Sequence, residues 1–284
     1  MNSIKVKSLN CMLPTIKACR RRLKVKLLYG SMQAGLLFYL FASCSENESI
    51  RYLTDLEQDN IKGPVIRLVT ETYQVDSLGQ TGNLESVTIE IFNKLGYTIT
   101  DSTKNLMPAN EVVNFLEYNR NGSLSSVITF ENGKKQSSMS LRYNGDRCTL
   151  INMYDVNAKL QGYYDNISQT KRGLLLSVNS YDSTGSLVMS FVNEYDSIYQ
   201  TRATAKDRTG TVKSDIIIHL TENKQQKDVL EVSYFKDSST QKHLFYNYDK
   251  WDSVGNWIQQ TVFDDDKKPI KIVNRIFWYR KEPS

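Results

Sequence analysis

Cys44 has the clearest chemical role in this 284-residue chain. An apolar run over residues 35–41 precedes it, the small residues Ala42 and Ser43 follow that run, and a basic segment lies upstream at residues 17–26. This order is typical of a secretory signal, and an apolar run of roughly ten residues is too short to cross a bilayer as a permanent helix. The small side chains suit a peptidase that cleaves before a lipid-modified cysteine. We therefore expect the Cys44 thiol to be the nucleophile that receives the lipid.

This stretch resembles the lipobox of bacterial lipoproteins, with Phe41 where that family prefers an aliphatic residue. A plain signal peptide and a buried core helix are the alternative interpretations. The acidic residues 45–48 resemble the export tag of Bacteroides-type bacteria, and an ordinary solvated linker would look the same. The resemblance implies a protein held in the outer membrane by lipid on Cys44, at the cell surface or otherwise on the periplasmic face. The leader is residues 1–43, and translation starts at Met1 or Met12.

The net charge changes sign when the leader is removed. The full chain has 36 Lys/Arg and 31 Asp/Glu, and residues 1–43 hold eight of the basic residues and none of the acidic ones. The mature chain thus has 28 basic and 31 acidic residues, a net charge of −3. No Lys/Arg cluster follows the leader, so we expect no nucleic-acid partner.

The mature chain offers few residues for catalysis or metal binding. Cys148 is its one cysteine after Cys44, which excludes an internal disulfide, and a free cysteine in a strand pattern is usually buried. His219 and His243 are too few for a histidine metal site, and residues 264–266 lack the spaced oxygen ligands of a calcium loop. We predict no catalytic residue, no metal and no cofactor. A glycan-active hydrolase stays open as an alternative, because paired carboxylates need only be close in space.

A short motif recurs along the chain, with an aromatic residue, then Asn or Asp, then Gly three residues later. Asn or Asp at the start of a turn binds the backbone ahead of it, and Gly takes the left-handed conformation without a Cβ clash. Each copy therefore predicts a hairpin tip. The complete copies are Phe92-Asn93-Lys94-Leu95-Gly96, Tyr118-Asn119-Arg120-Asn121-Gly122, Tyr181-Asp182-Ser183-Thr184-Gly185 and Trp251-Asp252-Ser253-Val254-Gly255, and Tyr154-Asp155-Val156-Asn157-Ala158 is a copy without the glycine.

Between these tips, β-branched and aromatic residues recur at every second position, as in residues 125–130 and 271–279. Alternation with turns every 11 to 13 residues predicts an all-β fold. We expect an antiparallel meander that forms a curved sheet or partial barrel. A short helix is predicted over residues 48–60. The expected division is a leader (1–43), a tether with the short helix (44–60) and a β domain (61–284).

The recurring motif resembles the YD repeats of RHS-type proteins. The segments Lys62-Gly63-Pro64-Val65-Ile66-Arg67 and Asp252-Ser253-Val254-Gly255-Asn256-Trp257 are similar to segments of YD-repeat-like lipoproteins of Bacteroides-type bacteria. The resemblance covers most of residues 60–280. It implies a curved, spiralling sheet whose repeat residues are structural, so it provides no catalytic residue.

Aromatic residues crowd into the last third of the chain, and Tyr246, Tyr248, Trp251 and Trp257 are the candidates for stacking on a ligand. Exposed rings on a sheet would bind a glycan or an envelope protein, whereas alternate buried rings would fill the core. We expect a non-catalytic, surface-anchored lipoprotein that serves as a binding or structural module of the envelope. A carrier of lipid or of another envelope component is a further alternative.

Overall fold

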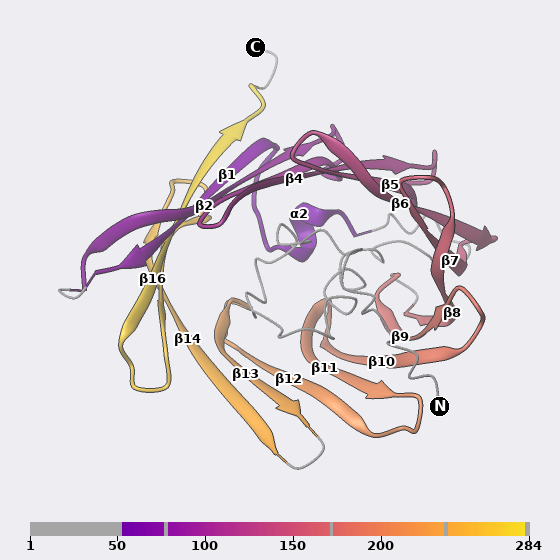
Figure 1. Ribbon diagram of the computed structural model, residues 1–284. Coiled ribbons are helices and arrows are strands. Elements are labelled where there is room, and N and C mark those ends of the chain that lie inside the picture. The colour runs from indigo at the N-terminus through magenta and orange to yellow at the C-terminus, as the bar shows by residue number, and fades with distance from the viewer. Residues whose placement is uncertain (1–52, 77–78, 171–172, 236–237, 282–284) are drawn as a thin grey trace.

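The protein is a closed antiparallel β-barrel in the computed structural model, which describes residues 53–76, 79–170, 173–235 and 238–281 (Figure 1). Each strand pairs with the next one along the chain. The strands are β1 (Val65–Val75), β2 (Thr81–Phe92), β3 (Thr98–Leu106), β4 (Ala109–Tyr118), β5 (Leu124–Glu131), β6 (Lys134–Asn144), β7 (Arg147–Asp155), β8 (Leu160–Gln169), β9 (Leu175–Asp182), β10 (Leu187–Asp196), β11 (Tyr199–Asp207), β12 (Val212–Leu220), β13 (Gln226–Tyr234), β14 (Ser239–Trp251), β15 (Trp257–Phe263) and β16 (Pro269–Tyr279).

The barrel closes because its first and last strands pair. β1 and β16 are antiparallel neighbours from Val65 opposite Tyr279 to Gln74 opposite Lys271. Closure satisfies the backbone groups that an open sheet would leave at its two edges. The predicted all-β meander is confirmed, but the curved sheet or partial barrel is in fact a complete 16-stranded barrel. The assignment to the YD-repeat (RHS-like) proteins is wrong, since an open spiral would leave β1 and β16 unpaired.

The recurring motif forms hairpin tips, as its residue types predicted. At the β4–β5 tip, the Asn119 amide donates to the Ser123 carbonyl at 2.8 Å and the Gly122 amide donates to the Asn119 carbonyl at 3.0 Å. Gly122 has a φ of +87°, and Ala158 takes a φ of +60° at the equivalent place of its own hairpin. The glycine-free copy therefore keeps the same turn and places a side chain in the left-handed region.

Alternate residues of each strand face the interior of the barrel. On β1, Leu68, Thr70 and Thr72 point inward, and Leu68 packs with Phe92 and with Leu56 of the helix α2 (Asp55–Gln58). The largest buried apolar cluster lines the inner wall from β4 to β11. The core therefore follows the wall of the barrel.

The segment 53–64, which we call the plug, lies across one end of the barrel, and Figure 1 shows α2 within the ring of strands. A reciprocal capping box between Thr54 and Glu57 starts this helix. It has only four residues, whereas a helix over residues 48–60 was predicted; residues 48–52 lie outside the described chain.

Three hairpins at this end hold the plug, and in the β14–β15 hairpin Asn256 Oδ1 accepts a hydrogen bond of 2.7 Å from the Lys62 amide. The Leu56 amide donates to the Gly96 carbonyl at 3.4 Å in the β2–β3 hairpin. Asn60 donates to the Asn223 carbonyl at 3.1 Å in the β12–β13 hairpin. We call this end of the barrel the plugged end, and the end with the β1–β2 and β15–β16 hairpins the opposite end.

The outer wall carries charged side chains along the strands. Arg202 on β11 binds Asp215 on β12 through two hydrogen bonds of 3.0 and 2.6 Å. Glu71 on β1 accepts a hydrogen bond of 2.7 Å from the Tyr73 hydroxyl. Among the described residues, no helix is long and apolar enough to cross a membrane.

Candidate ligand site in the barrel lumen

A cavity of about 540 Å³ lies inside the barrel against β1–β3 and β14–β16. It reaches Val75 and Pro269, the strand ends at the opposite end of the barrel from the plug. Its volume is within the range of pockets that hold small organic ligands. The six strands that line it come from the two ends of the chain, and the β1–β16 pairing joins them.

Hydroxyl and amide groups cover one half of this wall. Strand register places them in two rows across β1, β2 and β3, which are Thr70, Thr88 and Thr103 in one row and Thr72, Ser86 and Asn105 in the other. The Thr88 and Thr103 hydroxyls are 3.0 Å apart and share a hydrogen bond. The Thr70 hydroxyl is buried and has no hydrogen-bond partner among the described residues. We call these six residues the hydroxyl ladder.

Apolar and aromatic side chains cover the other half of the wall. Leu244, Trp257, Val262 and Val273 form one buried cluster, and Tyr246 packs against it. Burial raises the pKa of Tyr246, so its hydroxyl stays neutral and can donate a hydrogen bond. The halves meet at the β16–β1 seam, where Val273 is opposite Thr72.

Charged groups lie at the margins of the cavity. The Lys271 ammonium is 2.5 Å from the Glu85 carboxylate, and both residues line the cavity near the strand ends. Lys242 on β14 lines it as well. Deeper in the wall, the Arg275 guanidinium lies 3.5 Å from the centre of the Trp257 ring, which it covers on one face.

The four aromatic residues predicted to stack on a ligand lie in three different places. Tyr246 and Trp257 line the lumen cavity, and Trp257 is buried. Tyr248 packs between the rings of Trp251 and Trp257, and its hydroxyl donates to the Gln226 carbonyl at 3.0 Å. Trp251 is exposed at the plugged end. The four rings therefore do not form one exposed platform.

Sequence reasoning missed the hydroxyl ladder. Single Thr, Ser and Asn residues in strands carry no motif. The available signal was their alternation along β1, β2 and β3, but only the cross-strand register shows that they share one face.

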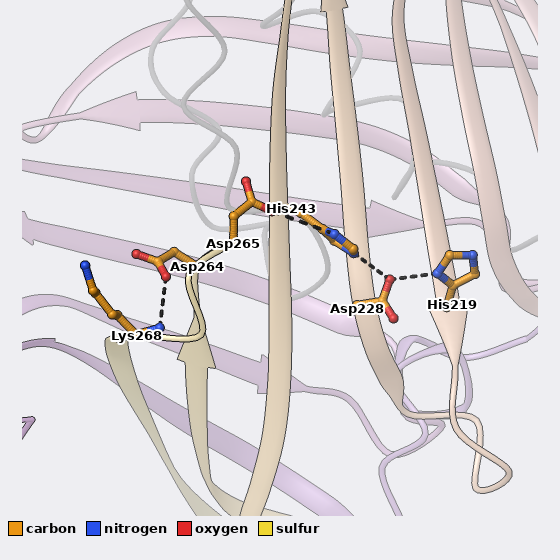
Figure 2. A network of polar contacts seen from close by, with 6 residues as sticks. All are labelled: His219, Asp228, His243, Asp264, Asp265 and Lys268. Atoms are coloured by element: carbon orange, nitrogen blue, oxygen red, sulfur yellow. Dashed lines mark hydrogen bonds and ion pairs between the residues drawn. The ribbon is translucent and has the colours of Figure 1, made fainter.

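A second polar cluster lies on the outer wall, where both histidines of the chain meet one carboxylate. The Asp228 Oδ1 atom on β13 lies 2.7 Å from His219 Nδ1 on β12 and 2.9 Å from His243 Nε2 on β14 (Figure 2). Burial alone would raise the pKa of Asp228, but the hydrogen bonds from His243 and His219 outweigh it and hold the pKa below its ordinary value.

Neither histidine had a supporting pattern in the sequence, and strand pairing alone brings both of them to Asp228. The Asp265 carboxylate approaches His243 Nδ1 to 3.8 Å from the β15–β16 hairpin. Within the described ranges, no group of three or more His, Cys, Asp or Glu side chains is arranged to hold a metal ion. We interpret the cluster as a structural tie across three neighbouring strands.

Asp55 is a buried carboxyl inside the plug. It accepts a hydrogen bond of 2.7 Å from the Thr98 amide, and the Tyr118 hydroxyl lies 3.3 Å away. Burial raises its pKa to about 7, although the bond from Thr98 lowers it, and the negative charges of Asp59 and Glu90 add to the rise. The plug thus holds a carboxyl that keeps its proton in mildly acidic solution.

Cys44 and Cys148 differ in what the structure shows of them. Cys148 is buried on β7 and forms no disulfide with a described residue, and its burial agrees with its strand pattern. Cys44 lies outside the described residues, so its lipidation stays a prediction, as do the leader and the tether.

No protein-family model matches the sequence, and no curated protein matches it. Among solved structures, a porin-like protein from Bacteroides uniformis is 10% identical with a TM-score of 0.50, over 75% of this chain and 98% of that chain. A TcdB2-TccC3 complex is 9% identical with a TM-score of 0.27, over 72% of this chain and 15% of that chain. A Photorhabdus luminescens Tc holotoxin pore is 9% identical with a TM-score of 0.19, over 72% of this chain and 16% of that chain.

The likeness to the porin-like protein shows a shared barrel fold. At 10% identity it shows the fold alone, and the two alignments with TM-scores of 0.27 and 0.19 support no argument. Together with the closed strand order, this likeness replaces the YD-repeat assignment.

Proposed function

We propose that the protein is a non-catalytic barrel of the cell envelope, held to the outer membrane by lipid on Cys44, whose lumen binds a small glycan. The porin-like description of the Bacteroides uniformis structure supports an envelope location. The charged outer wall, with Arg202 and Asp215 near the middle of their strands, favours contact with water over burial in lipid. A separate anchor such as the Cys44 lipid would then hold the protein at the membrane.

The main support for ligand binding is the cavity wall, which has one polar half and one apolar half. A sugar ring has an apolar C–H face and a rim of hydroxyl groups, which match the two halves of this wall. The hydroxyl ladder supplies six neutral hydrogen-bonding side chains, and the β14–β16 half supplies apolar area. The unpaired Thr70 hydroxyl favours a ligand that provides a partner at that point, because an unsatisfied buried hydroxyl costs about 1–3 kcal/mol.

Binding ranks ahead of hydrolysis for a chemical reason. Glycoside hydrolysis uses two carboxyl groups that flank the scissile bond. Among the residues that line this cavity, Glu85 is the one carboxylate, and Lys271 is paired with it. A carrier of lipid remains the second candidate, and the apolar cluster of the β14–β16 half is the observation that favours it.

The test is calorimetric titration of the protein with a panel of neutral and acidic oligosaccharides and with a fatty acid. We expect an oligosaccharide to bind, and Thr70→Val to weaken it about tenfold by removing one hydrogen bond to the ligand. The same substitution should leave the unfolding free energy of the free protein equal or about 1 kcal/mol higher, because it removes an unpaired buried hydroxyl.

Thr100→Val on β3 is the control, since Thr100 lies in the outward-facing register next to Phe115. Equal oligosaccharide affinity in the Thr70→Val and Thr100→Val proteins would contradict the lumen site. Binding of the fatty acid alone would favour the carrier.

A further inference from the structure

An apolar surface lies on the outside of the barrel, near the plugged end. It consists of five side chains that are between 37% and 46% exposed, namely Ile91, Ile99, Phe115, Ile276 and Trp278. They belong to β16, β2, β3 and β4, which are neighbours around the barrel together with β1. We call these five residues the outer apolar patch.

The direction of these side chains follows from their neighbours in sequence. Phe92 and Phe277 pack against the plug, so Ile91, Ile276 and Trp278 beside them face outward. Cross-strand register aligns three of the positions, since Arg67 on β1 is opposite both Trp278 and Ile91. The patch therefore lies on both sides of the seam where the barrel closes, with Arg67 between Trp278 and Ile91.

Charged residues limit the patch toward the opposite end. Four residues further along β1 from Arg67, the register row of Glu71 also contains Lys104 and Glu111. Four residues of a strand span about 13 Å, and the two-residue step from Trp278 to Ile276 within the patch spans about 7 Å. The apolar surface is thus shallow, comparable with the depth of about 5–10 Å to which interfacial elements enter a bilayer and well below the band of about 25 Å on a membrane-spanning barrel.

Basic side chains accompany the patch. The Arg67 guanidinium lies 4.8 Å from the centre of the Trp278 ring. Lys94 and Arg280 line the groove between the plug and the β2–β3 hairpin at the same end. Tryptophan beside arginine is typical of proteins at a membrane surface, where the ring enters the interface and the cation binds lipid phosphate.

The anchor places the lipid within reach of this end. Thr54, at the start of the described chain, packs against Gly96 in the β2–β3 hairpin. Nine peptide steps separate Cys44 from Leu53, and they can extend at most about 32 Å. Lipid on Cys44 therefore holds the plugged end within that distance of the bilayer.

We infer that the outer apolar patch docks the barrel side-on against the phospholipid surface to which Cys44 is anchored. This inference rests on the proposed lipid anchor for the approach of the barrel, and on the patch itself for its orientation. In this arrangement the wall around β16 and β1–β4 touches lipid, while β10, across the ring in Figure 1, stays in water.

The test uses the lipidated protein in vesicles of phosphatidylethanolamine and phosphatidylglycerol whose acyl chains carry bromine, which quenches tryptophan. The fluorescence of Trp278 is obtained by subtracting the tryptophan fluorescence of the Trp278→Phe variant from that of the wild-type protein. We expect bromine to reduce that signal about twofold or more, because the ring enters the interface. Ile91→Thr with Phe115→Thr should abolish most of this quenching, since the pair removes apolar area from the patch.

Val192→Trp in the Trp278→Phe background is the matched control, because Val192 on β10 is 40% exposed and Trp278 is 39% exposed. We expect no quenching at position 192. Equal quenching at both positions, or none at Trp278, overturns the inference. Shielding of Trp278 from a water-soluble quencher without any effect of bromine would also overturn it, in favour of a second copy of the chain on the patch.

Failure of the anchor gives a different result. Mass spectrometry of the mature protein would then show Cys44 without acyl groups. The same protein added to the vesicles would still show whether bromine quenches Trp278. Failure of the lipid anchor can therefore be distinguished from failure of the docking by the patch.

Discussion

Two aspartates show how surroundings set the behaviour of one residue type. Asp55 in the plug accepts a hydrogen bond from the Thr98 amide, but burial outweighs that bond and raises its pKa to about 7. Asp228 on the outer wall is also largely buried, but hydrogen bonds from two imidazoles outweigh that burial and lower its pKa. The two carboxyls should therefore give stability profiles that change with pH in opposite directions.

Asp55→Asn should remove a destabilising pH dependence. The unfolded Asp55 carboxyl ionises near 3.8, whereas the folded one keeps its proton up to about 7. In that window the folded state binds more protons, so its stability falls as the pH rises, and ionising the buried group costs ~4 kcal/mol. The asparagine still accepts the Thr98 amide. We expect the variant to be about 2 kcal/mol more stable at pH 8, with no such slope between pH 4 and 7.

Urea denaturation at several pH values measures this effect. Asp165→Asn on β8 is the control, because it removes a carboxyl that is not fully buried. An Asp55→Asn profile parallel to the wild-type profile would mean that the plug tolerates the ionised carboxylate.

Asp228→Asn should act in the reverse direction. The folded pKa of Asp228 is lowered, so its contribution to stability is present above the unfolded pKa and is lost as the pH falls through the folded pKa. We expect a loss of about 1 kcal/mol at pH 7. The difference from wild type should disappear in strong acid. A difference that persists there would show that the substitution disturbs packing instead of the bonds to His219 and His243.

At the scale of the element, the hairpin tips show which positions need glycine. Gly185 in the β9–β10 hairpin has a φ of +87°, and the nearest atom to an added Cβ would be the Tyr163 hydroxyl at 3.5 Å. This distance is an ordinary van der Waals contact, so a side chain at position 185 is opposed only by the positive φ of the backbone. Ala158 accepts that conformation at a φ of +60°.

Gly185→Val should therefore destabilise the protein by about 1–3 kcal/mol, because a β-branched residue is strained at positive φ. Gly185→Ala should cost less. Gly122→Val should behave like Gly185→Val, since Gly122 has the same φ of +87°. Chemical denaturation of each variant measures these changes.

Ala158→Gly is the opposite substitution in a tip of the same geometry. It should be neutral or stabilise the protein by up to about 1 kcal/mol, because glycine relieves the strain of the left-handed conformation. A clear loss of stability would show that the Ala158 side chain makes contacts that outweigh this strain.

At the scale of the whole molecule, a closed wall, a plug at one end and a cavity toward the other form a cup. The cavity walls come from both ends of the chain, so closure of β1 on β16 is a condition for the lumen site. The proposed anchor lies just before the plug. The proposed membrane anchor and the proposed ligand site therefore lie at opposite ends of the barrel.

Cys44→Ser should abolish membrane association of the mature protein, because it removes the atom that accepts the lipid. Labelling with radioactive palmitate and partitioning into detergent measure the result. Cys148→Ala is the control, since Cys148 is buried in β7 and should leave the label in place. Protein of mature size that stays in the detergent phase after Cys44→Ser would contradict the anchor.

Neighbouring residues were enough to predict the strands and turns. Alternation along residues 125–130 and 271–279 indicated strands, and the Asn/Asp…Gly motif located the tips at Gly122 and Gly185, because both signals depend on neighbouring residues only. The same signals could not distinguish an open spiral from a closed barrel.

Closure, the lumen site and the Asp228 cluster were decided by the tertiary structure. Val65 meets Tyr279 across more than two hundred residues, and no local pattern encodes that pairing. Strand register brings Thr70 into the wall of the lumen cavity, and it brings His219 and His243 to Asp228. The physical reason is that side chains with weak individual preferences acquire a role from the neighbours that the closed sheet gives them.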